Sequence, residues 1–589
     1  MKHSKIVSIV ILASVLLVSC NKQLDLPSDG RITMDQVFSD YNRTRGYLNS
    51  CYGHLPPPAI DRASFTDEAQ HVDDVLPGSA FSNWYNGNVT AVNYHQNSAD
   101  GSPWAQLFEG IRKCNVFIEN IGTATVHASE EEKAGWTAQA RTLRALYYLQ
   151  LIKRYGGVPI FTTPLDTEHD FSQDRRASFA EVVQFILQDC DAALAVPATR
   201  QGFPWEVYDN QYGIMTRAVA YAIKSQAVTY AASPLWSDGT FTWEDATRIN
   251  AEALSECLAH DYRLFDVPPS PGTAQNAYAL YFFTSSDDQR AVDKETIYHA
   301  GNQLSIWRDA GLPTNDGMDR AGPSPTQELV DSYEMANGEA PITGYSDDNR
   351  LAPIVNPASG YDPDNPYEGR DPRFYASIYY NGALRYLNQP AGRKVETFVG
   401  GQEGISSQNR QHTRTGYYLR KFNNFQSGLN NEADGAVRLF RLAELYLNFA
   451  ESAYQSVGPD VPVNLGDFSM SARDAVSAVR ERAGMPPFPA GMSKEDFEKK
   501  YRNERRVELA FEEHRFFDVR RWKILDETDR FVTGMRIRKN GDELNYERFR
   551  FENRQSSADK YLMYPIDQDE VNKIRGLTGE NWQNPGWLD

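Results

Sequence analysis

The chain has 589 residues, with 60 basic against 79 acidic side chains and a formal net charge of −19. Its 41% hydrophobic content, with 32 Tyr, 29 Phe and 10 Trp, excludes wholesale disorder and allows a large buried core. The acidic balance excludes broad binding to nucleic acid or to an anionic membrane surface, because both need a basic face.

The first twenty residues have the layout of a bacterial lipoprotein signal. A short basic head precedes the apolar run Ile6–Val18, which as a helix spans about 20 Å, too short for a bilayer core of about 30 Å. The run ends in Leu17-Val18-Ser19-Cys20, which resembles the lipobox whose cysteine thiol is acylated. We expect residues 1–19 to be removed and Cys20 to carry the lipid. An ordinary cleaved signal with an incidental cysteine is the alternative.

The remaining cysteines are expected to be buried free thiols. Cys51, Cys114, Cys190 and Cys257 are far apart, with no CxxC pair and no histidine at metal-ligand spacing, so a zinc site is not expected. Two of them, Cys190 and Cys257, fall on apolar helical stripes, which favours burial over disulfide formation.

Helical signals follow in chain order. Ser129 and Glu132 form a capping-box pattern that opens an apolar face extending to Leu151, and Gly156-Gly157 ends that helix. Further helices are predicted at about 178–193, 216–232, 246–257, 442–453 and 472–483, and from Ser493 onwards. Antiparallel pairs with alanines on facing stripes resemble tetratricopeptide-type hairpins. An irregular helix bundle is the alternative, because the strict repeat consensus is absent.

Two regions lack this helical periodicity. Residues 55–102 and 261–437 are rich in Pro, Gly, Asn and Asp, with Tyr and Trp scattered among them. Loops this long inside a compact protein are usually functional or disordered, and their aromatic content favours ordered, functional loops.

A set of short motifs also occurs in a fixed order along the chain. They are Leu24-Asp25-Leu26-Pro27, Trp104–Ile111, Leu146-Tyr147-Tyr148, Lys153–Pro159, Ala231–Trp236, Asp371-Pro372-Arg373, Arg441–Asn448, Arg502–Phe511, His514–Asp518, Tyr564-Pro565-Ile566 and Gln583–Trp587. Together they resemble the SusD/RagB family of Bacteroidetes outer-membrane lipoproteins. The departures are Glu513, where Gly is common, and Asp567, where Pro is common.

The resemblance implies a mainly α fold with about four tetratricopeptide-like helix pairs and a large irregular, loop-rich part. It makes residues 20–589 one SusD-like domain, with its helical scaffold at about 30–54, 103–260 and 438–525 and with ligand-binding insertions at 55–102 and 261–437. It further implies a lipid-anchored position on the cell surface at the outer membrane. The implied partner is a SusC-like, TonB-dependent transporter barrel, and the implied ligand is an oligosaccharide or polysaccharide; some members of the family serve peptide uptake.

Catalytic, metal and basic-site signals are sparse. No G-x-S-x-G, H-E-x-x-H, phosphate-binding or dinucleotide-binding motif occurs, and carboxylate pairs such as Asp73-Asp74 are expected by chance among 79 acidic residues. Arginines and carboxylates alternate along Arg502–Arg521, which favours an internal ion-pair lattice over a basic ligand site. No cofactor is expected, although Asp362-Pro363-Asp364-Asn365-Pro366 offers oxygen ligands for calcium without EF-hand spacing.

A glycan site needs aromatic rings to stack on sugar faces, beside polar groups that bind the hydroxyls. Trp84 and Tyr85 beside Asn83 fit this pattern, as do Trp307 and Arg308. We expect at least one of Trp84 and Trp307 to touch ligand. The other candidate glycan-binding residues are Asp67, Asp40, Asn42 and Arg370.

These observations lead to the hypothesis of a non-catalytic surface lipoprotein that captures a glycan and delivers it to a transporter barrel. The negative charge favours a neutral glycan over a sulfated one. Peptide capture by the same scaffold, a hydrolase or lyase, and a purely structural lipoprotein are the alternatives.

Overall fold

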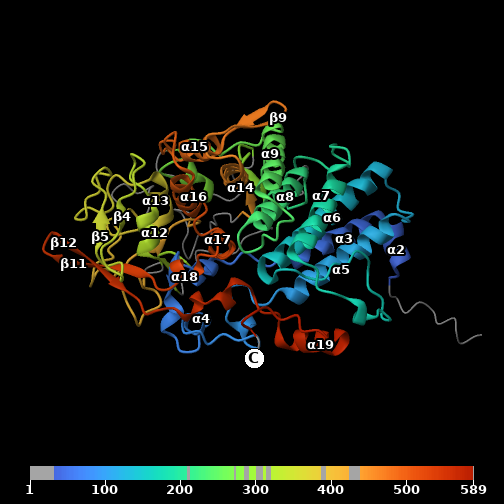
Figure 1. Cartoon of the computed structure of the whole chain (residues 1–589), viewed down its shortest axis with the longest axis horizontal. Coiled ribbons are helices and arrows are strands. Elements are labelled where there is room, and N and C mark those ends of the chain that lie inside the picture. Colours follow the sequence, from blue (N-terminus) through green and yellow to red (C-terminus); the bar gives the residue numbers. More distant parts are fainter. Residues whose placement is uncertain are drawn as a thin grey trace, which may run out of the picture.

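The computed structural model describes residues 32–207, 213–270, 274–283, 291–299, 310–312, 320–385, 393–423 and 438–587. Cys20, Trp307 and Arg308 lie outside these residues. Figure 1 shows most of the long helices on one side of the molecule and short strands with connecting loops on the other. In the described ranges, no helix is long and apolar enough to cross a membrane.

The scaffold is built from helices that pack against their neighbours in sequence. Its helices are α2 (Met34–Ser39), α3 (Tyr41–Cys51), α5 (Trp104–Ile121), α6 (Glu130–Tyr155), α7 (Phe179–Leu194), α8 (Arg217–Ala232), α9 (Trp243–Ala259), α14 (Leu442–Ser456), α15 (Ala472–Arg482), α16 (Lys494–Glu508) and α17 (His514–Arg521). Each of α5 to α8 packs on the next helix, and α14 packs on α8, α9 and α15. The predicted mainly helical scaffold is confirmed (Figure 1).

The predicted helix starts are confirmed, with one change in detail. Ser178 and Glu181 form the full capping box of α7, each side chain bonding the other residue's backbone N–H. At α6 the hydroxyl of Ser129 caps the backbone N–H of Glu132, but the Glu132 carboxylate accepts a hydrogen bond from the Tyr41 hydroxyl at 2.5 Å. The Glu132 side chain therefore does not complete the predicted capping box; its hydrogen bond to Tyr41 links α6 to α3.

The remaining helices and the strands are mostly short, and the strands form two-stranded sheets. They are α4 (Ala80–Tyr85), α10 (Ala277–Phe283), α12 (Gln327–Ser332), α13 (Pro372–Ser377), α18 (Leu525–Thr528), α19 (Gln568–Thr578), β1 (Ala69–His71), β2 (Thr296–Tyr298), β3 (Pro323–Pro325), β4 (Ile342–Tyr345), β5 (Pro353–Val355), β6 (Ile378–Tyr379), β7 (Tyr418–Leu419), β8 (Phe440–Arg441), β9 (Val463–Leu465), β10 (Phe468–Met470), β11 (Thr533–Asn540) and β12 (Glu543–Arg550). The antiparallel pair β1–β3 joins residues 55–102 to residues 261–437.

The longest hairpin lies in a part of the sequence without a predicted strand. Strands β11 and β12 pair in full antiparallel register, from Thr533 opposite Arg550 to Asn540 opposite Glu543. The two-residue turn contains Gly541 at φ 62°, a conformation that glycine adopts without strain. The Gly541-Asp542 dipeptide between the two strands is a typical signal for such a hairpin turn and could have identified it.

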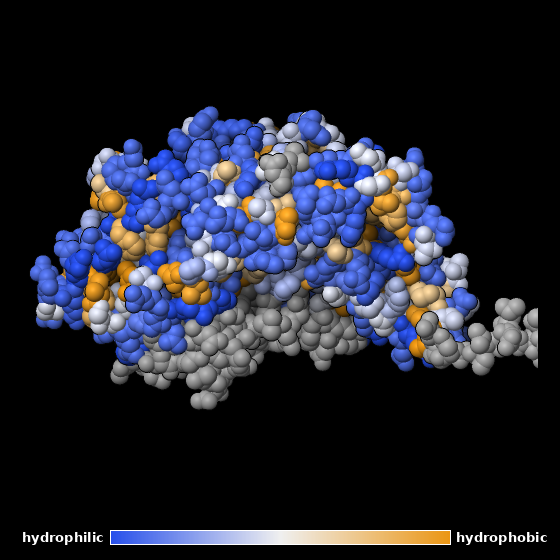
Figure 2. All heavy atoms as spheres, turned by 90° about the horizontal axis from the view of Figure 1, so that it is seen from below, coloured by the Kyte–Doolittle hydropathy of each residue, from blue (hydrophilic) through white to orange (hydrophobic). Residues whose placement is uncertain are grey.

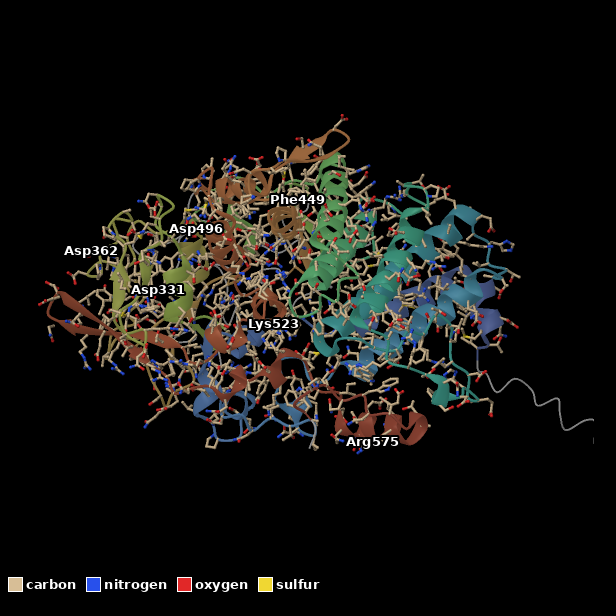
Figure 3. The ribbon with its side chains drawn as sticks, viewed as in Figure 1. Asp331, Asp362, Phe449, Asp496, Lys523 and Arg575 are labelled. Atoms are coloured by element: carbon tan, nitrogen blue, oxygen red, sulfur yellow. The ribbon has the colours of Figure 1, made fainter. Side chains whose placement is uncertain are left out.

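The hydrophobic core has two main parts. The larger lies within the scaffold and includes Phe449, which Figure 3 shows among the helices. The second lies under the loop-rich side and includes Tyr278 and Phe374. Hydrophilic residues dominate much of the described surface in Figure 2, with small hydrophobic patches among them.

The four described cysteines and the acidic loop around Asp362 can be located in the structure. Cys51, Cys114, Cys190 and Cys257 are free and buried, as expected. Asp362 lies at the outer edge of the loop-rich side (Figure 3), where its carboxylate accepts hydrogen bonds from the Asp364 backbone and the Asn365 side chain. Over the described ranges, no group of three or more His, Cys, Asp or Glu side chains could hold a metal ion.

A buried network of ion pairs links the two sides of the molecule, with Arg441 near its centre. The Arg441 guanidinium contacts Glu295 at 2.8 Å, Glu508 at 2.7 Å and Glu512 at 2.7 Å, and all four side chains are buried. Glu512 also accepts a hydrogen bond from the Lys421 ammonium at 2.7 Å. Burial acts to raise the pKa of Glu512, but Arg441 and Lys421 together lower it to about 2.

The network extends to charged side chains of residues 502–521. Their ion pairs lie inside the protein, which confirms the predicted internal ion-pair lattice. Glu504 binds Arg373 and Arg480, whereas Arg505 and Arg521 share Asp518. The sequence predicts partners at spacings of three and four residues on one helix, and the pair of Arg521 with Asp518 fits this prediction. Most other partners come from segments far away in the sequence, so the lattice ties separate elements together.

Removing the central cation should destabilise the fold strongly. Replacing Arg441 with Met leaves three buried carboxylates without their shared partner, and breaking a buried pair in this way costs about 3–5 kcal/mol. Denaturant unfolding of the Arg441→Met variant measures this loss. The matched control is Arg175→Met, which removes an exposed partner of Glu181 and should change stability by about 0.5 kcal/mol or less. Equal effects of the two variants would contradict this role for the network.

The same network predicts how stability depends on pH. Because the folded-state pKa of Glu512 is depressed from 4.5 to about 2, its ionised form stabilises the protein above pH 4.5, and that stabilisation is lost as the pH falls towards 2. The Glu512→Gln variant should therefore lose on the order of 3 kcal/mol at pH 7, and the difference from the parent should shrink below pH 4.5. Denaturant unfolding between pH 2 and 7 measures it; a difference that does not vary with pH would contradict the prediction.

Candidate functional site

Charged side chains gather where the two loop-rich regions meet, beside the β1–β3 pair. We call them the Asp61–Arg414 cluster, which consists of Asp61, His71, Asp73, Asp74, Arg320, Arg410 and Arg414. The acidic members and His71 come from residues 55–102, and the arginines come from residues 261–437. The pairing of β1 with β3 brings the two sets together, since Gln70 lies opposite Ser324.

The ion pairs of the cluster form two neighbouring sets, one around Asp73 and one between Arg414 and Asp74. Arg320 contacts Asp73 at 2.9 Å and Asp61 at 3.3 Å. Arg410 also binds Asp73, with one contact at 2.9 Å. Arg414 contacts Asp74 at 2.7 Å. Burial acts to raise the pKa of Asp73, but hydrogen bonds from the guanidinium groups of Arg410 and Arg320 hold it below its usual value.

His71 fixes the orientation of the acidic side of the cluster. Its ring is buried and stacks on Phe81, with ring centroids 3.5 Å apart. The backbone N–H of Asp73 donates to Nδ1 at 3.1 Å, and Nε2 lies 3.2 Å from an Asp61 carboxylate oxygen. Because Nδ1 accepts a hydrogen bond, Nε2 is the ring nitrogen that donates to Asp61.

The cluster reaches the surface and is balanced in charge. The side chain of Arg410 is 40% exposed, while those of Arg320 and Asp61 are about half as exposed. Three aspartates face three arginines, so these described groups carry no net charge. Such a surface can exchange hydrogen bonds with the hydroxyl groups of a neutral ligand.

Two of the predicted glycan-binding aromatics belong to the core. Trp84 exposes 2% of its surface and contacts Phe65 and Tyr561, each with ring centroids 4.8 Å away. Tyr85 is also buried, and its hydroxyl donates to the Ser64 carbonyl oxygen at 2.8 Å. A stacking platform needs an accessible ring face. The structure therefore gives Trp84 and Tyr85 a packing role and corrects their predicted role as surface platforms for a sugar.

Asp67 and Arg370 also have structural roles. The buried Asp67 carboxylate accepts two hydrogen bonds from the Arg515 guanidinium, each at 2.9 Å, and pairs with Arg506 at 3.0 Å. Arg370 is buried and donates to the carbonyl oxygens of Pro366, Val330 and Tyr333. Neither side chain is accessible to a polysaccharide, so the structure corrects both assignments.

The other predicted residues do not converge on one place. Asn83 is half-buried and donates to the Asn97 side chain at 2.8 Å. Asp40 caps the start of α3 through the Arg43 backbone N–H, and Asn42 is exposed two residues further on, in the first turn of the helix. Asp40 and Asn42 lie in the helical scaffold, away from the loop-rich side that carries the cluster (Figure 1). A glycan-binding role for Asn83, Asp40 and Asn42 remains a prediction.

Sequence reasoning missed the arginines of the cluster. In the sequence Asp73 and Asp74 stand out only as a carboxylate pair, and no motif surrounds Arg320, Arg410 or Arg414. The partners are separated by more than 200 residues, and only the β1–β3 pairing brings them together. No local pattern could have identified them.

Comparisons with known families cover most of the chain. A model described as the SusD family matches residues 283–587, more than half of the chain. A second model, described as starch-binding associating with outer membrane, matches residues 33–227.

Two curated relatives come from Formosa agariphila. SusD-like protein P25 is 23% identical over 435 residues, which is 72% of this chain and 70% of that protein. SusD-like protein P38 is 23% identical over 195 residues, which is 33% of this chain and 37% of that protein. The match therefore spans little more than a third of the length of P38.

Solved structures agree with the fold over nearly the whole chain. A SusD-like protein from Bacteroides fragilis is 26% identical with a TM-score of 0.75, covering 94% of this chain and 99% of that one. The surface glycan-binding protein A from Bacteroides fluxus is 18% identical with a TM-score of 0.58, covering 93% and 100%. At 18% identity the second likeness shows the fold alone. On the family match and these likenesses, the chain belongs to the SusD family.

Proposed function

We propose that this protein is a non-catalytic, surface-exposed lipoprotein that binds a neutral oligosaccharide or polysaccharide and delivers it to a SusC-like, TonB-dependent transporter. The structural observation that carries the ligand class is the exposed, charge-balanced Asp61–Arg414 cluster. Its arginines donate hydrogen bonds to vicinal hydroxyl groups and its aspartates accept hydrogen bonds from them. Because these described groups have no net charge, they do not favour a charged ligand. The matched description of starch binding and the glycan-binding name of one structural relative support the same class.

The protonation of the carboxyl groups supports binding over hydrolysis. A glycosidase needs a carboxylic acid that holds a proton near neutral pH and can reach the glycosidic oxygen. Among the described residues, the carboxyl groups with a raised pKa are Glu68, Glu328 and Asp529, and burial is the main cause in each case. All three are buried, so none is placed to protonate a bound polysaccharide.

The location follows from the N-terminal sequence and the family. Cys20 ends a lipobox-like run, and several acyl chains on one cysteine would hold the protein stably to a membrane. The second family description refers to the outer membrane. We propose that residues 20–589 form one domain tethered at the outer-membrane surface by Cys20.

Glycan binding should depend on Arg410. The Arg410→Ala variant removes the most exposed cation of the cluster, and losing hydrogen bonds to a charged group should weaken binding about tenfold or more. Calorimetry measures the affinity for neutral α-glucan, β-glucan, fructan and hemicellulose fragments, and for a sulfated polysaccharide and a peptide mixture. Comparison of these affinities identifies the ligand class. Arg175→Ala on the scaffold is the matched control and should bind as the parent does. Binding of peptides alone, or equal binding by both variants, would contradict the proposal.

Membrane attachment should depend on Cys20. Replacing Cys20 with Ala removes the thiol that would be acylated, so the protein should no longer incorporate labelled palmitate and should leave the outer-membrane fraction. Cell fractionation and labelling of the full chain with its leader measure both effects. Asn21→Ala is the control and should stay in the membrane. An unlabelled parent chain would contradict lipidation.

A further inference from the structure

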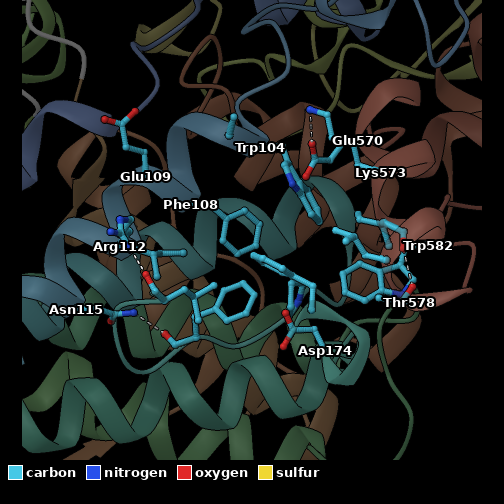
Figure 4. A pocket seen from close by; sticks show the side chains of 18 of the residues that line it. Trp104, Phe108, Glu109, Arg112, Asn115, Asp174, Glu570, Lys573, Thr578 and Trp582 are labelled. Atoms are coloured by element: carbon cyan, nitrogen blue, oxygen red, sulfur yellow. Dashed lines mark hydrogen bonds and ion pairs between the residues drawn. The ribbon is translucent and has the colours of Figure 1, made fainter. Parts of the chain in front are cut away.

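A pocket that shares no residue with the Asp61–Arg414 cluster lies between α5, the segment after α6 and α19. Its volume of about 530 Å³ is within the range of pockets that bind small molecules. Figure 4 shows Trp104, Phe108 and Trp582 around it. The other large apolar side chains that line it are Ile111, Pro159, Phe161, Leu165, Phe171, Ile574 and Leu577. Aromatic rings therefore make up much of its wall.

The mouth of the pocket lies between α5 and α19. Ala105, Glu109 and Arg112, which line the pocket from α5, are exposed and share one face of that helix. Lys573, which lines the pocket from α19, is also exposed. The short 3-10 helix η5 (Phe171–Gln173) packs on α19 and closes one side. A small molecule can therefore enter between the two α-helices and be enclosed on the other sides.

Hydrogen bonds fix the wall that follows α6. The Asn115 amide donates to the carbonyl oxygens of Phe161 and Thr163, and the Arg112 guanidinium donates to the carbonyl oxygen of Leu165 at 2.7 Å (Figure 4). These bonds tie the segment after α6 to α5. A ligand that enters a pocket with fixed walls loses little binding free energy to ordering them.

The same bonds disfavour a sugar in this pocket. Because Asn115 and Arg112 already donate to backbone carbonyl oxygens, few donors are left for a ligand with many hydroxyl groups. A sugar would bury several hydroxyl groups against aromatic walls without partners, which is costly. The pocket therefore suits a mainly apolar ligand.

The charged groups around the pocket favour a neutral ligand. The charged side chains that line it are Glu109, Arg112, Asp174, Glu570 and Lys573. Glu570 pairs with Lys573 at 3.4 Å, and Asp174 lies 3.0 Å from the His169 ring. Three carboxylates and two cations leave no excess of positive charge that would attract an anion. The Glu109 side chain is 60% exposed, so water weakens its attraction for a cation.

One donor at the pocket has no acceptor within the described chain. Trp104 is 7% exposed and packs edge-on against Tyr155, with ring centroids 5.1 Å apart, yet its indole N–H donates to no described group. A buried tryptophan N–H usually finds an acceptor, as that of Trp582 does with Glu580 at 3.0 Å. Because Trp104 lines the pocket, an oxygen atom on a bound molecule would supply the missing acceptor.

We propose that the pocket between α5 and α19 binds a small, neutral aromatic molecule that carries a carbonyl or ether oxygen. The aromatic part of the ligand packs among Trp104, Phe108 and Trp582, and its oxygen accepts the hydrogen bond of the Trp104 indole. This is a second ligand class for the protein. The site does not depend on the proposed glycan ligand or on lipidation.

Titration with a fluorescent aromatic ketone tests the site. The probe is prodan, a neutral naphthalene ketone whose emission shifts to the blue in apolar surroundings. The protein should bind prodan saturably, with one molecule per chain and a blue-shifted emission. The Ala105→Trp variant places a large side chain at the mouth of the pocket and should weaken binding about tenfold or more.

The matched control makes the same substitution elsewhere on the scaffold. Ala192 is exposed on α7 and does not line the pocket, so the Ala192→Trp variant should bind prodan as the parent does. Since Ala105 is also exposed, both variants should fold, and thermal unfolding checks this. Absence of saturable binding by the parent, or equal binding by the two variants, would overturn the proposal.

A second variant tests the indole donor separately from the packing of the ring. Trp104→Phe keeps an aromatic ring but removes the N–H, so the affinity for prodan should fall about fivefold. Dimethylaminonaphthalene has the same two rings without the ketone, and the parent and the variant should bind it equally well. An equal loss for the two probes would show that Trp104 acts through packing alone, which would overturn its assignment as the donor to the ligand oxygen.

Discussion

The structure depends on the buried ion pairs that join the helical scaffold to the loop-rich side. Arg441 stands where β8 leads into α14, and it contacts Glu295 from the loop-rich region and Glu508 and Glu512 at the end of α16 and just beyond it. A buried charge is tolerated only when it has a partner and its hydrogen bonds are made. Every segment that supplies a partner is therefore held to the others, because moving one segment away would leave charges unpaired inside the protein.

The same principle positions the candidate site. Asp67 precedes β1 and is held by Arg515 on α17 and Arg506 on α16. The strand that follows, β1, pairs with β3. The segment that carries His71 and Asp73 is therefore held by the ion pairs of Asp67 before it and by this strand pairing. The partly exposed arginines of the Asp61–Arg414 cluster thus lie on a rigid base. Such a base lowers the ordering cost of binding, because the acidic groups that orient the arginines are already fixed.

A structural feature can be predicted from this sequence when it depends on residues that are close together in the chain. Helix starts and ends are local, so Ser178 with Glu181 and the Gly156-Gly157 stop correspond to real boundaries. The ion-pair partners and the cluster depend on contacts between residues hundreds of positions apart, which no periodicity reveals. The sequence around Trp84 shows the limit most clearly. An aromatic residue among asparagines suits a sugar site or a loop core equally well, and only its burial against Phe65 and Tyr561 decides between them.

The buried ion pairs also indicate where the net charge of −19 lies in the structure. Many arginines form ion pairs inside the protein. Buried carboxylates pair with Arg373, Arg441, Arg505 and Arg521. Because the described interior pairs its charges, the acidic excess falls mainly on the remaining surface. That surface repels polyanions over the range of the Debye length, about 8 Å at physiological ionic strength. On the proposed function, a neutral chain with hydroxyl groups is the ligand that this surface would disfavour least, since it is not repelled by the surrounding field and can hydrogen-bond to both the arginines and the aspartates of the cluster.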